Sequence, residues 1–468
     1  MRARWFRRAF YLRPIGERGA VTFKRFWRRV GRNALFANPN PMKRITSLLL
    51  LGALTVSAIG IGQAAETTVA ASAPASFEIP ATDEGLPGAG PIRRYDWFRG
   101  LWQSRRSAWA KRVEQDQGAI VFLGDSITQG WGDHFQSLFP GVKVANRGIS
   151  GDTTRGVLIR MKEDVLALNP KGVVLLIGTN DLDEWASPEI AAGNMKLILG
   201  ALNEHDAKMP IILCKVMPSA VSMRRPKAQI DKMNQLYFDL VKDFPQVTVL
   251  DTWALFADVK GDAKADEFPD LLHPNAIGYA RWEKALRPVL ESTGLIEAWP
   301  DDFKPEPGFV SLTNGKDLSG WGYKGQPAFD GKTLSDDGRY LAKNGRLIAT
   351  VARVERDYKT LWTTRTFPKD FELRLEFRAS PNADSGVFVR APQLQVRDYH
   401  IAGPYVNLKN YRPLEWNEIV VVVKGGLAHC TCNGEVLIDA MPVPADGPIG
   451  LESDRGQMEY RRIRVREL

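Results

Sequence analysis

Apolar and polar residues alternate in two different ways along the chain, and the first pattern covers residues 95–295. Short, mostly apolar runs, typical of strands covered on both faces, are separated there by segments whose apolar residues have the spacing of one helix face. The pattern predicts strands at 119–123, 142–146, 172–177, 210–216 and 247–250, and helices at 95–115, 157–168, 188–204, 228–244 and 275–295. Because strand and helix alternate, we predict a parallel sheet with helices on both faces.

The second pattern follows residues 301–308, a proline-containing segment that we interpret as a hinge. Between Phe371 and Arg378 apolar and charged residues alternate one by one, as in a strand with one buried face. Further strand-like runs, separated by turn residues, lie at 386–390, 419–424, 428–432, 436–439 and 460–465. Short strands at regular spacing predict an antiparallel sandwich over residues 309–468.

The N-terminal residues precede both patterns. Met42-Lys43-Arg44 is followed by an uncharged apolar segment that ends at Ala64-Ala65, which is the order found in a cleavable secretory signal. An uncleaved membrane anchor is the alternative, because the segment is near spanning length. We interpret residues 1–65 as a basic leader and signal, with the true start at Met1 or Met42, and residues 66–91 as a disordered linker. The protein is therefore expected to be exported, periplasmic or extracellular, without a stable membrane span after signal removal.

Charge and cysteine content narrow the classes of partner and cofactor. The chain of 468 residues has a net charge of +9, but residues 1–44 contribute +12, which leaves −3 for the rest. A mildly acidic body argues against a nucleic-acid partner. Cys430 and Cys432 are two residues apart on a strand-like run, a spacing that rarely allows a disulfide, so we expect buried thiols. No spacing of Cys and His resembles a zinc site, and we expect no metal and no cofactor.

Candidate chemistry begins at Ser126, which follows the first predicted strand in the turn Gly124-Asp125-Ser126. A hydroxyl at this position can project from the edge of the sheet, beside the free N–H groups at the start of the next helix. Alone the motif is weak evidence, because Asp-Ser after a strand is also common as an ordinary turn or helix cap.

The predicted sheet brings further residues to the same edge, since ligands of such sheets bind outside the carboxyl ends of the strands. Gly151 follows the second strand, Asn180 follows the third, and Asp270 and His273 lie in the loop after the fifth. Ser126, His273 and Asp270 can supply the nucleophile, the base and the orienting carboxylate of acyl transfer. The backbone N–H groups of Ser126 and Gly151 and the side chain of Asn180 can form an oxyanion hole. Each residue has an ordinary structural explanation by itself, but their convergence on one edge favours catalysis.

With these residues in place, the segment 95–295 resembles the SGNH (GDSL) hydrolase superfamily, in particular the branch of the platelet-activating factor acetylhydrolase catalytic subunits. Its four sequence blocks occur in order at 124–126, 146–152, 178–181 and 270–273. The resemblance implies a three-layer α/β, flavodoxin-like domain over residues 92–300 and ester hydrolysis through an acyl-serine. It does not fix the acyl group or the alcohol, because the superfamily acts on lipids, thioesters and acetylated sugars.

The C-terminal residues resemble the 3-keto-disaccharide hydrolase family, whose fold is a concanavalin-like jelly roll. The matching residues are 309–321, 384–390, Trp416-Asn417, Asn433-Gly434 and 447–451. That family usually has a Glu at the position of Gln393, the first residue of the stretch Gln393-Leu394-Gln395. Without this carboxylate the domain lacks a potential acid or base, which argues against independent hydrolysis here.

The jelly roll is also expected to offer a concave face that holds sugar through planar polar groups and exposed rings. The residues that could do so are Trp321, Arg390, Gln395, His400 and Tyr405. For Arg390, Gln395 and His400 the alternative is a structural role, in which they pair with loops of the sandwich.

We therefore expect a serine esterase that removes short acyl groups, acetyl in particular, from an acylated carbohydrate or another small ester. The chain has no long apolar insertion that could form a lid or an acyl tunnel, which favours a short acyl group. The alternative is a C-terminal domain that acts on 3-keto-disaccharides as a hydrolase or lyase, with an auxiliary esterase. A non-catalytic surface adhesin is disfavoured by the intact Ser126, Asp270 and His273. The sequence leaves the natural ester and the oligomeric state open.

Overall fold

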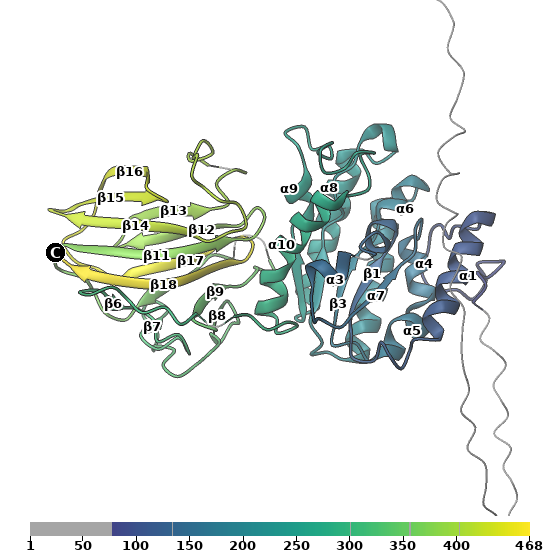
Figure 1. Cartoon of the computed structure of the whole chain (residues 1–468), viewed down its shortest axis with the longest axis horizontal. Helices are drawn as coiled ribbons and strands as arrows, with labels where there is room; N and C mark the ends of the chain where they lie inside the picture. The colour runs from purple at the N-terminus through teal and green to yellow at the C-terminus, as the bar shows by residue number, and fades with distance from the viewer. Residues whose placement is uncertain (1–76, 133, 300, 355–356, 402) are drawn as a thin grey trace, which may run out of the picture. The chain divides into compact units, whose positions relative to one another are not determined.

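The computed structural model describes residues 77–468 except 133, 300, 355–356 and 402. These residues form an α/β domain, drawn from blue to green in Figure 1, and a β-sandwich, drawn from green to yellow. The predicted leader and signal, 1–65, and the first part of the predicted linker, 66–76, lie outside the described residues. Within the described ranges, no helix has the length and apolar character needed to cross a membrane.

A five-stranded parallel sheet in the order β2-β1-β3-β4-β5 forms the centre of the α/β domain. Its strands are β1 (Ile120–Gly124), β2 (Val144–Gly148), β3 (Gly172–Leu176), β4 (Ile211–Cys214) and β5 (Val247–Leu250). Every residue of β1 and β3 is buried, as expected for strands that are covered on both faces. The predicted α/β fold with a parallel sheet is thus confirmed.

Helices precede the first strand of this sheet, connect consecutive strands and follow the last one. The longer ones are α1 (Asp96–Ala110), α7 (Pro188–His205), α8 (Lys227–Leu240) and α10 (Ala276–Ser292). The predicted helix at 157–168 is instead divided into α4 (Thr154–Ile159), α5 (Met161–Asp164) and a 3₁₀ turn at Leu166–Leu168. The periodicity did not indicate four short helices, namely α2 (Ser126–Gln129), α3 (His134–Leu138), α6 (Thr179–Asp183) and α9 (Thr252–Phe256).

Alternate residues of each strand pack into different helix layers, because successive side chains of a strand point to opposite faces. Val121 and Leu123 of β1 belong to a core cluster with residues of α7 and α8. Ile120 and Phe122 belong to a second cluster that includes Trp282 of α10. The sheet is therefore the middle of three layers.

The segment 77–91, which the sequence predicts as the end of a disordered linker, makes defined contacts with the α/β domain. Ile79 is buried, and the Asp83 carboxylate forms an ion pair of 2.6 Å with Arg155. The Ala89 N–H donates to Asn194 Oδ1 at 2.9 Å, and Asn194 Nδ2 donates to the Ala89 carbonyl at 2.8 Å. The prediction is wrong over this range, because a side-chain amide on α7 supplies backbone hydrogen bonds that composition alone cannot indicate.

Two antiparallel sheets form the sandwich, as predicted. One has the order β13-β12-β17-β10-β7, and the other has the order β16-β15-β14-β11-β18-β9-β8, with β6 beside β18. Their strands are β6 (Val310–Ser311), β7 (Trp321–Gly322), β8 (Tyr340–Lys343), β9 (Arg346–Ala349), β10 (Lys359–Thr363), β11 (Phe371–Ala379), β12 (Asp384–Val389), β13 (Gln393–Arg397), β14 (Asn417–Lys424), β15 (Leu427–Cys432), β16 (Glu435–Pro442), β17 (Ile449–Ser453) and β18 (Met458–Glu467).

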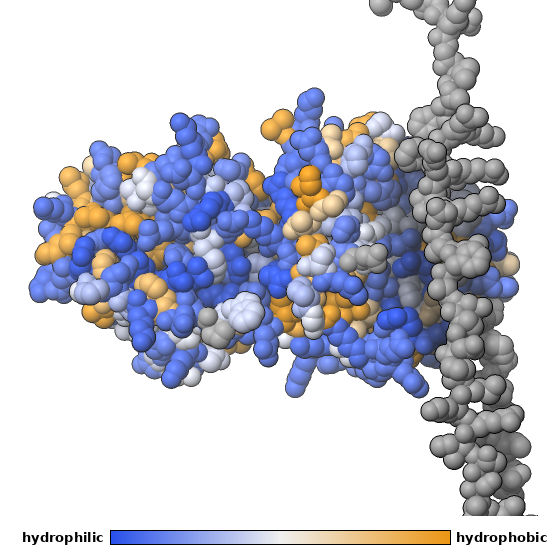
Figure 2. All heavy atoms as spheres, viewed as in Figure 1, coloured by the Kyte–Doolittle hydropathy of each residue, from blue (hydrophilic) through white to orange (hydrophobic). Residues whose placement is uncertain are grey.

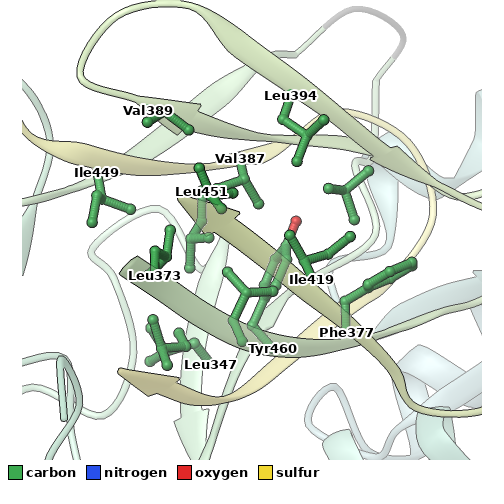
Figure 3. Packing of buried hydrophobic residues seen from close by; sticks show 14 of the residues in the cluster. Leu347, Leu373, Phe377, Val387, Val389, Leu394, Ile419, Ile449, Leu451 and Tyr460 are labelled. Carbon is green, nitrogen blue, oxygen red and sulfur yellow. The ribbon is translucent and has the colours of Figure 1, made fainter. Parts of the chain in front are cut away.

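The core of the sandwich lies between these sheets. Leu373 and Phe377 of β11 and Ile419 of β14 face Val387 and Leu451 of the other sheet (Figure 3). The charged residues of the alternating segment in β11 lie on the opposite face, and hydrophilic residues cover much of the surface seen in Figure 2. Cys430 and Cys432 are free and buried, as is Cys214, and burial raises the pKa of each thiol to about 12. These thiols are therefore not activated nucleophiles.

Candidate active site

Ser126 is the first residue of α2, and only Asp125 separates it from the end of β1. The side chain of Asp125 caps this helix, because its Oδ1 accepts a hydrogen bond of 2.9 Å from the Ile127 N–H. The first N–H groups of a helix have no acceptor within it. The Ser126 N–H is therefore free to face a developing negative charge beside the Ser126 hydroxyl.

The loop that contains Asp270 and His273 returns to this edge. His273 Nε2 lies 2.9 Å from Ser126 Oγ, and His273 Nδ1 lies 2.7 Å from Asp270 Oδ2. The other oxygen of Asp270 accepts hydrogen bonds from the backbone N–H groups of Leu272, at 3.0 Å, and His273, at 2.7 Å. These contacts fix the imidazole with one nitrogen toward the carboxylate and the other toward the hydroxyl.

The acid and the imidazole are open to solvent, with 52% of the Asp270 side chain and 42% of the His273 side chain exposed. Partial burial acts to raise the pKa of Asp270. Hydrogen bonds from the His273 ring and from two backbone N–H groups outweigh it, so the pKa lies below its usual value. Asp270 is consequently a carboxylate at neutral pH and accepts the Nδ1–H of His273.

Asn180 lies at the start of α6, and its amide orientation is fixed on both sides. Its Nδ2 donates to the Asp152 carbonyl at 2.9 Å, and its Oδ1 accepts from Arg225 Nη2 at 3.2 Å. Arg225 is held in turn by the carbonyl and hydroxyl of Thr179. A guanidinium can only donate hydrogen bonds, so Arg225 holds the Asn180 amide with its oxygen toward the guanidinium. The NH₂ group then points toward Asp152. One of its hydrogens bonds the Asp152 carbonyl, and the other remains to be donated.

Gly151 completes the group of residues predicted at this edge, and its backbone has a φ of 88°, which favours glycine. A hollow of about 470 Å³ is lined by Ser126, Gly151, Asn180 and His273, among other residues. A second hollow of about 390 Å³ also includes Ser126 and His273 and is lined further by Gln129, His134 and Tyr279. The structure thus brings all the residues predicted at this edge together around the Ser126 hydroxyl.

A buried ion pair fixes the loop that carries Gly151. Arg160 Nε donates to Asp152 Oδ2 at 2.8 Å, and neither side chain is exposed. Arg160 Nη2 also donates to the carbonyls of Gly124, at 3.2 Å, and Arg147, at 2.9 Å. One guanidinium therefore connects the ends of β1 and β2 with the loop beside the hollow.

Three buried carboxyl groups lie beneath the site. Burial raises the pKa of Asp125 and of Asp152 to about 6 and that of Asp181 to about 7. Asp181 accepts hydrogen bonds from the N–H and the hydroxyl of Thr154. Asp125 Oδ2 has no hydrogen-bond partner among the described residues.

Sequence reasoning missed several residues that line the first hollow, including Arg93, Trp97, Arg224 and Arg225. Arg224-Arg225 lies in the loop after β4, at the same edge as Ser126. The rule that located Asn180 could have identified this pair. Arg93 and Trp97 lie before the first strand, so strand order gives no indication of their position.

The predicted sugar-binding residues of the sandwich differ in their exposure to solvent. Trp321 is fully buried in its core and donates from Nε1 to the Leu312 carbonyl at 2.7 Å. Arg390 is also buried and donates to the carbonyls of Pro444 and Lys369, each at 2.7 Å. The prediction that these two side chains face a sugar is wrong, because each is occupied in the packing of the sandwich.

The three other predicted residues keep some access to solvent. Gln395 is half-buried and donates to Asp384 Oδ1 at 3.4 Å. His400 is exposed, with its ring 5.1 Å from that of Tyr411, and Tyr405 is half-buried against Tyr399. A sugar-binding role for these three stays a prediction.

The outer face of the β13-β12-β17-β10 sheet has features that the sequence did not indicate. Gln393 Nε2 donates to Glu452 Oε2 of β17. Gln393 occupies the position where the jelly-roll family usually has a Glu, so a carboxylate from another strand lies next to that position. Burial raises the pKa of Glu452. The rings of Trp362 and Phe388 lie 5.1 Å apart on this face, over Gly450, where a Cβ atom would meet the Trp362 ring.

Residues 122–281 match the family model described as the GDSL-like Lipase/Acylhydrolase family. Platelet-activating factor acetylhydrolase IB subunit alpha2 from Homo sapiens is 28% identical over 204 residues, which cover 43% of this chain and 87% of that protein. Subunit alpha1 from Pongo abelii is 27% identical over 194 residues, which cover 41% and 83%. The α/β domain is therefore similar to GDSL-like hydrolases, and we call it the GDSL-like domain.

Solved structures similar to the GDSL-like domain include the lipase/acylhydrolase from Enterococcus faecalis, at 25% identity and a TM-score of 0.32, which covers 38% of this chain and 97% of that one. A GDSL-like lipase from Bacteroides thetaiotaomicron is also 25% identical, with a TM-score of 0.35 and coverage of 40% and 94%. Residues 308–466 match the model of a 3-keto-alpha-glucoside-1,2-lyase-like domain, so the sandwich is similar to a second family. Among the residues that the structure describes, no group of three or more His, Cys, Asp or Glu side chains could hold a metal ion.

The raised pKa of Asp181 predicts a pH-dependent stability of the GDSL-like domain. An unfolded Asp ionises near pH 3.8, whereas folded Asp181 keeps its proton up to about pH 7. The folded state therefore binds more protons between these values, and stability falls as the pH rises through this window. Asp181→Asn removes this contribution, so the melting temperature should fall less between pH 5.5 and 8 than in the wild type, by about 2 °C or more.

Calorimetry at several pH values measures this slope. Asp302→Asn, at an exposed carboxylate, is the matched control and should keep the wild-type slope. The same slope in Asp181→Asn and in the wild type would contradict the assignment.

Proposed function

We propose that the GDSL-like domain is a serine esterase that removes short acyl groups, acetyl in particular, from carbohydrate. The observation that carries this proposal is the continuous hydrogen-bonded chain from Ser126 Oγ through His273 to Asp270. A hydroxyl, an imidazole and a carboxylate in this order are the parts needed to form and hydrolyse an acyl-enzyme.

In the first step, His273 takes the proton of Ser126 while the hydroxyl oxygen attacks the ester carbonyl carbon. The negative charge then moves to the carbonyl oxygen, which the N–H groups of Ser126 and Gly151 and the Asn180 amide stabilise. When the bond to the alcohol breaks, His273 gives its proton to the leaving oxygen. Ser126 is then acylated.

In the second step, water replaces the alcohol. His273 removes a proton from the water as it attacks the acyl carbon, and the same donors stabilise the second oxyanion. The bond to Ser126 Oγ then breaks, and His273 returns the proton to this oxygen. Asp270 stabilises the imidazolium each time it forms and keeps the ring in the productive tautomer.

The choice of substrate rests on two further observations. The hollows beside Ser126 are lined mainly by polar and charged residues, with few apolar side chains to hold a long acyl chain. The chain also carries a second domain from a family named for a sugar reaction. An acetylated carbohydrate accounts for both.

The substitution Ser126→Ala removes the attacking oxygen and leaves the fold, because the side chain lies at an open edge. Hydrolysis of p-nitrophenyl acetate should fall by about 10⁴-fold or more. Steady-state kinetics measure the loss, and circular dichroism verifies folding. Ser137→Ala, an exposed serine on α3, should keep full activity. Undiminished turnover in Ser126→Ala would exclude the proposed mechanism.

Export is part of the same proposal and rests on residues 42–65, whose basic, apolar and small-residue order is typical of a signal. We expect the mature chain in the periplasm or medium to begin close to Glu66. N-terminal sequencing of the fractionated protein tests this, and a full-length chain retained in the membrane fraction would contradict it.

A second candidate function follows from the outer face of the sandwich. Glu452 contacts Gln393, and the neighbouring rings of Trp362 and Phe388 could stack on a sugar. We propose that this face processes a 3-keto-glucoside, with Glu452 as the acid or base, since burial raises its pKa and makes the carboxylate a stronger base.

In the full-length protein, Glu452→Gln should abolish cleavage of a 3-keto-glucoside and keep hydrolysis of p-nitrophenyl acetate. Product formation is followed by chromatography. The control Glu467→Gln changes a mostly exposed carboxylate on β18 and should keep both activities. Cleavage that Glu452→Gln leaves unchanged would remove Glu452 from this role, and a wild-type protein without such cleavage would reject the second function.

A further inference from the structure

Two large aromatic side chains are exposed at the start of α1. Trp97 is 54% exposed and Tyr95 is 53% exposed, whereas Phe98, Trp102 and Trp109 of the same helix are buried. The Tyr95 and Trp97 rings are nearly parallel, at 13°, with their centroids 6.4 Å apart. Adjacent exposed rings of this size are typical of a binding surface rather than of an ordinary helix start.

One of these rings, that of Trp97, lies against the candidate oxyanion hole. Trp97 lines the same hollow as Ser126. A Cβ atom added to Gly151 would lie 2.6 Å from Trp97 Cη2 and 2.9 Å from Arg93 Nη1. A substrate whose carbonyl faces the Gly151 N–H therefore has the indole ring as its next neighbour.

A rigid polar frame surrounds the rings. Glu184 accepts hydrogen bonds from Arg93 Nε at 2.6 Å and from the Tyr95 hydroxyl at 3.4 Å. Asp183 pairs with Arg93 and, at 2.7 Å, with Arg224, whose side chain is 56% exposed. Planar charged groups are thus held beside the rings.

This combination matches the chemistry of a pyranose. Such a ring offers a face of C–H groups to an aromatic ring and a rim of hydroxyl groups to planar donors and acceptors. A long acyl chain would instead require a continuous apolar lining, but Trp97, Met223 and Leu272 are the large apolar residues among those that line this hollow.

We propose that Trp97 and Tyr95, framed by Arg93, Asp183 and Arg224, form the sugar subsite of the esterase. The subsite binds the pyranose that carries the ester, with its C–H face on Trp97 and its hydroxyl groups toward the polar frame. This inference rests on the proposed esterase function and assigns sugar recognition to the GDSL-like domain itself.

The test compares Trp97→Ala on two esters, 6-O-acetylglucose, which keeps its other hydroxyl groups free, and p-nitrophenyl acetate. The kcat/KM for the sugar ester should fall by about tenfold more than that for the small ester, mainly through KM, because only the sugar reaches the indole. Trp97→Phe should recover part of the loss. Trp299→Ala removes a ring that is 93% exposed and should match the wild type on both esters.

A binding measurement makes the result independent of turnover. Titration of Ser126→Ala with 6-O-acetylglucose should show saturable binding that Ser126→Ala combined with Trp97→Ala loses. Equal losses on both esters, or wild-type kinetics and binding in Trp97→Ala, would overturn the subsite. A wild-type protein that hydrolyses neither ester, while Ser126→Ala still binds the sugar through Trp97, would reject the esterase and keep the subsite.

Discussion

The candidate site depends on one buried guanidinium. Arg160 is fully buried and bonds to the last carbonyl of β1, a carbonyl near the end of β2 and the carboxylate of Asp152. Parallel strands place their carboxyl ends at one edge of a sheet, but they do not fix the loops that follow. Arg160 fixes one of these loops, and the Asp152 carbonyl then accepts the Asn180 amide. Removing one partner of such a buried pair costs about 3–5 kcal/mol, so the site and the stability of the domain share this contact.

Burial divides the titratable groups of the site into two sets with different roles. Asp270 and His273 are open to solvent, where hydrogen bonds keep the carboxylate ionised and the imidazole can exchange protons. Asp125, Asp152 and Asp181 are buried, and their raised pKa values follow from the loss of hydration. In the proposed mechanism, the proton transfers therefore take place at the rim. The buried set shapes the backbone that would present N–H groups to the proposed oxyanion.

Hydrophobic periodicity was sufficient to predict both folds, because burial on both faces of β1 and β3 and the alternation in β11 leave clear patterns. The rule that ligands bind at the carboxyl ends of parallel strands was sufficient to predict one shared site. The residues placed there are Ser126, Gly151, Asn180, Asp270 and His273. Periodicity could not indicate helices of four to six residues such as α2 and α6, which begin at caps and turns. It also could not show that Trp321 packs inside the sandwich, or that Glu452 reaches Gln393 across a neighbouring strand. Contacts between distant segments decide these positions.

We infer that Ser126 is the nucleophile and that His273 activates it. Reaction with a fluorophosphonate, followed by intact-mass analysis and peptide mapping, tests this claim directly, because the reagent labels an activated serine covalently. We expect a single adduct on the peptide that contains Ser126, and strongly slowed labelling in His273→Ala. An unlabelled protein, an adduct on a different serine, or labelling at the full rate without the imidazole would contradict it.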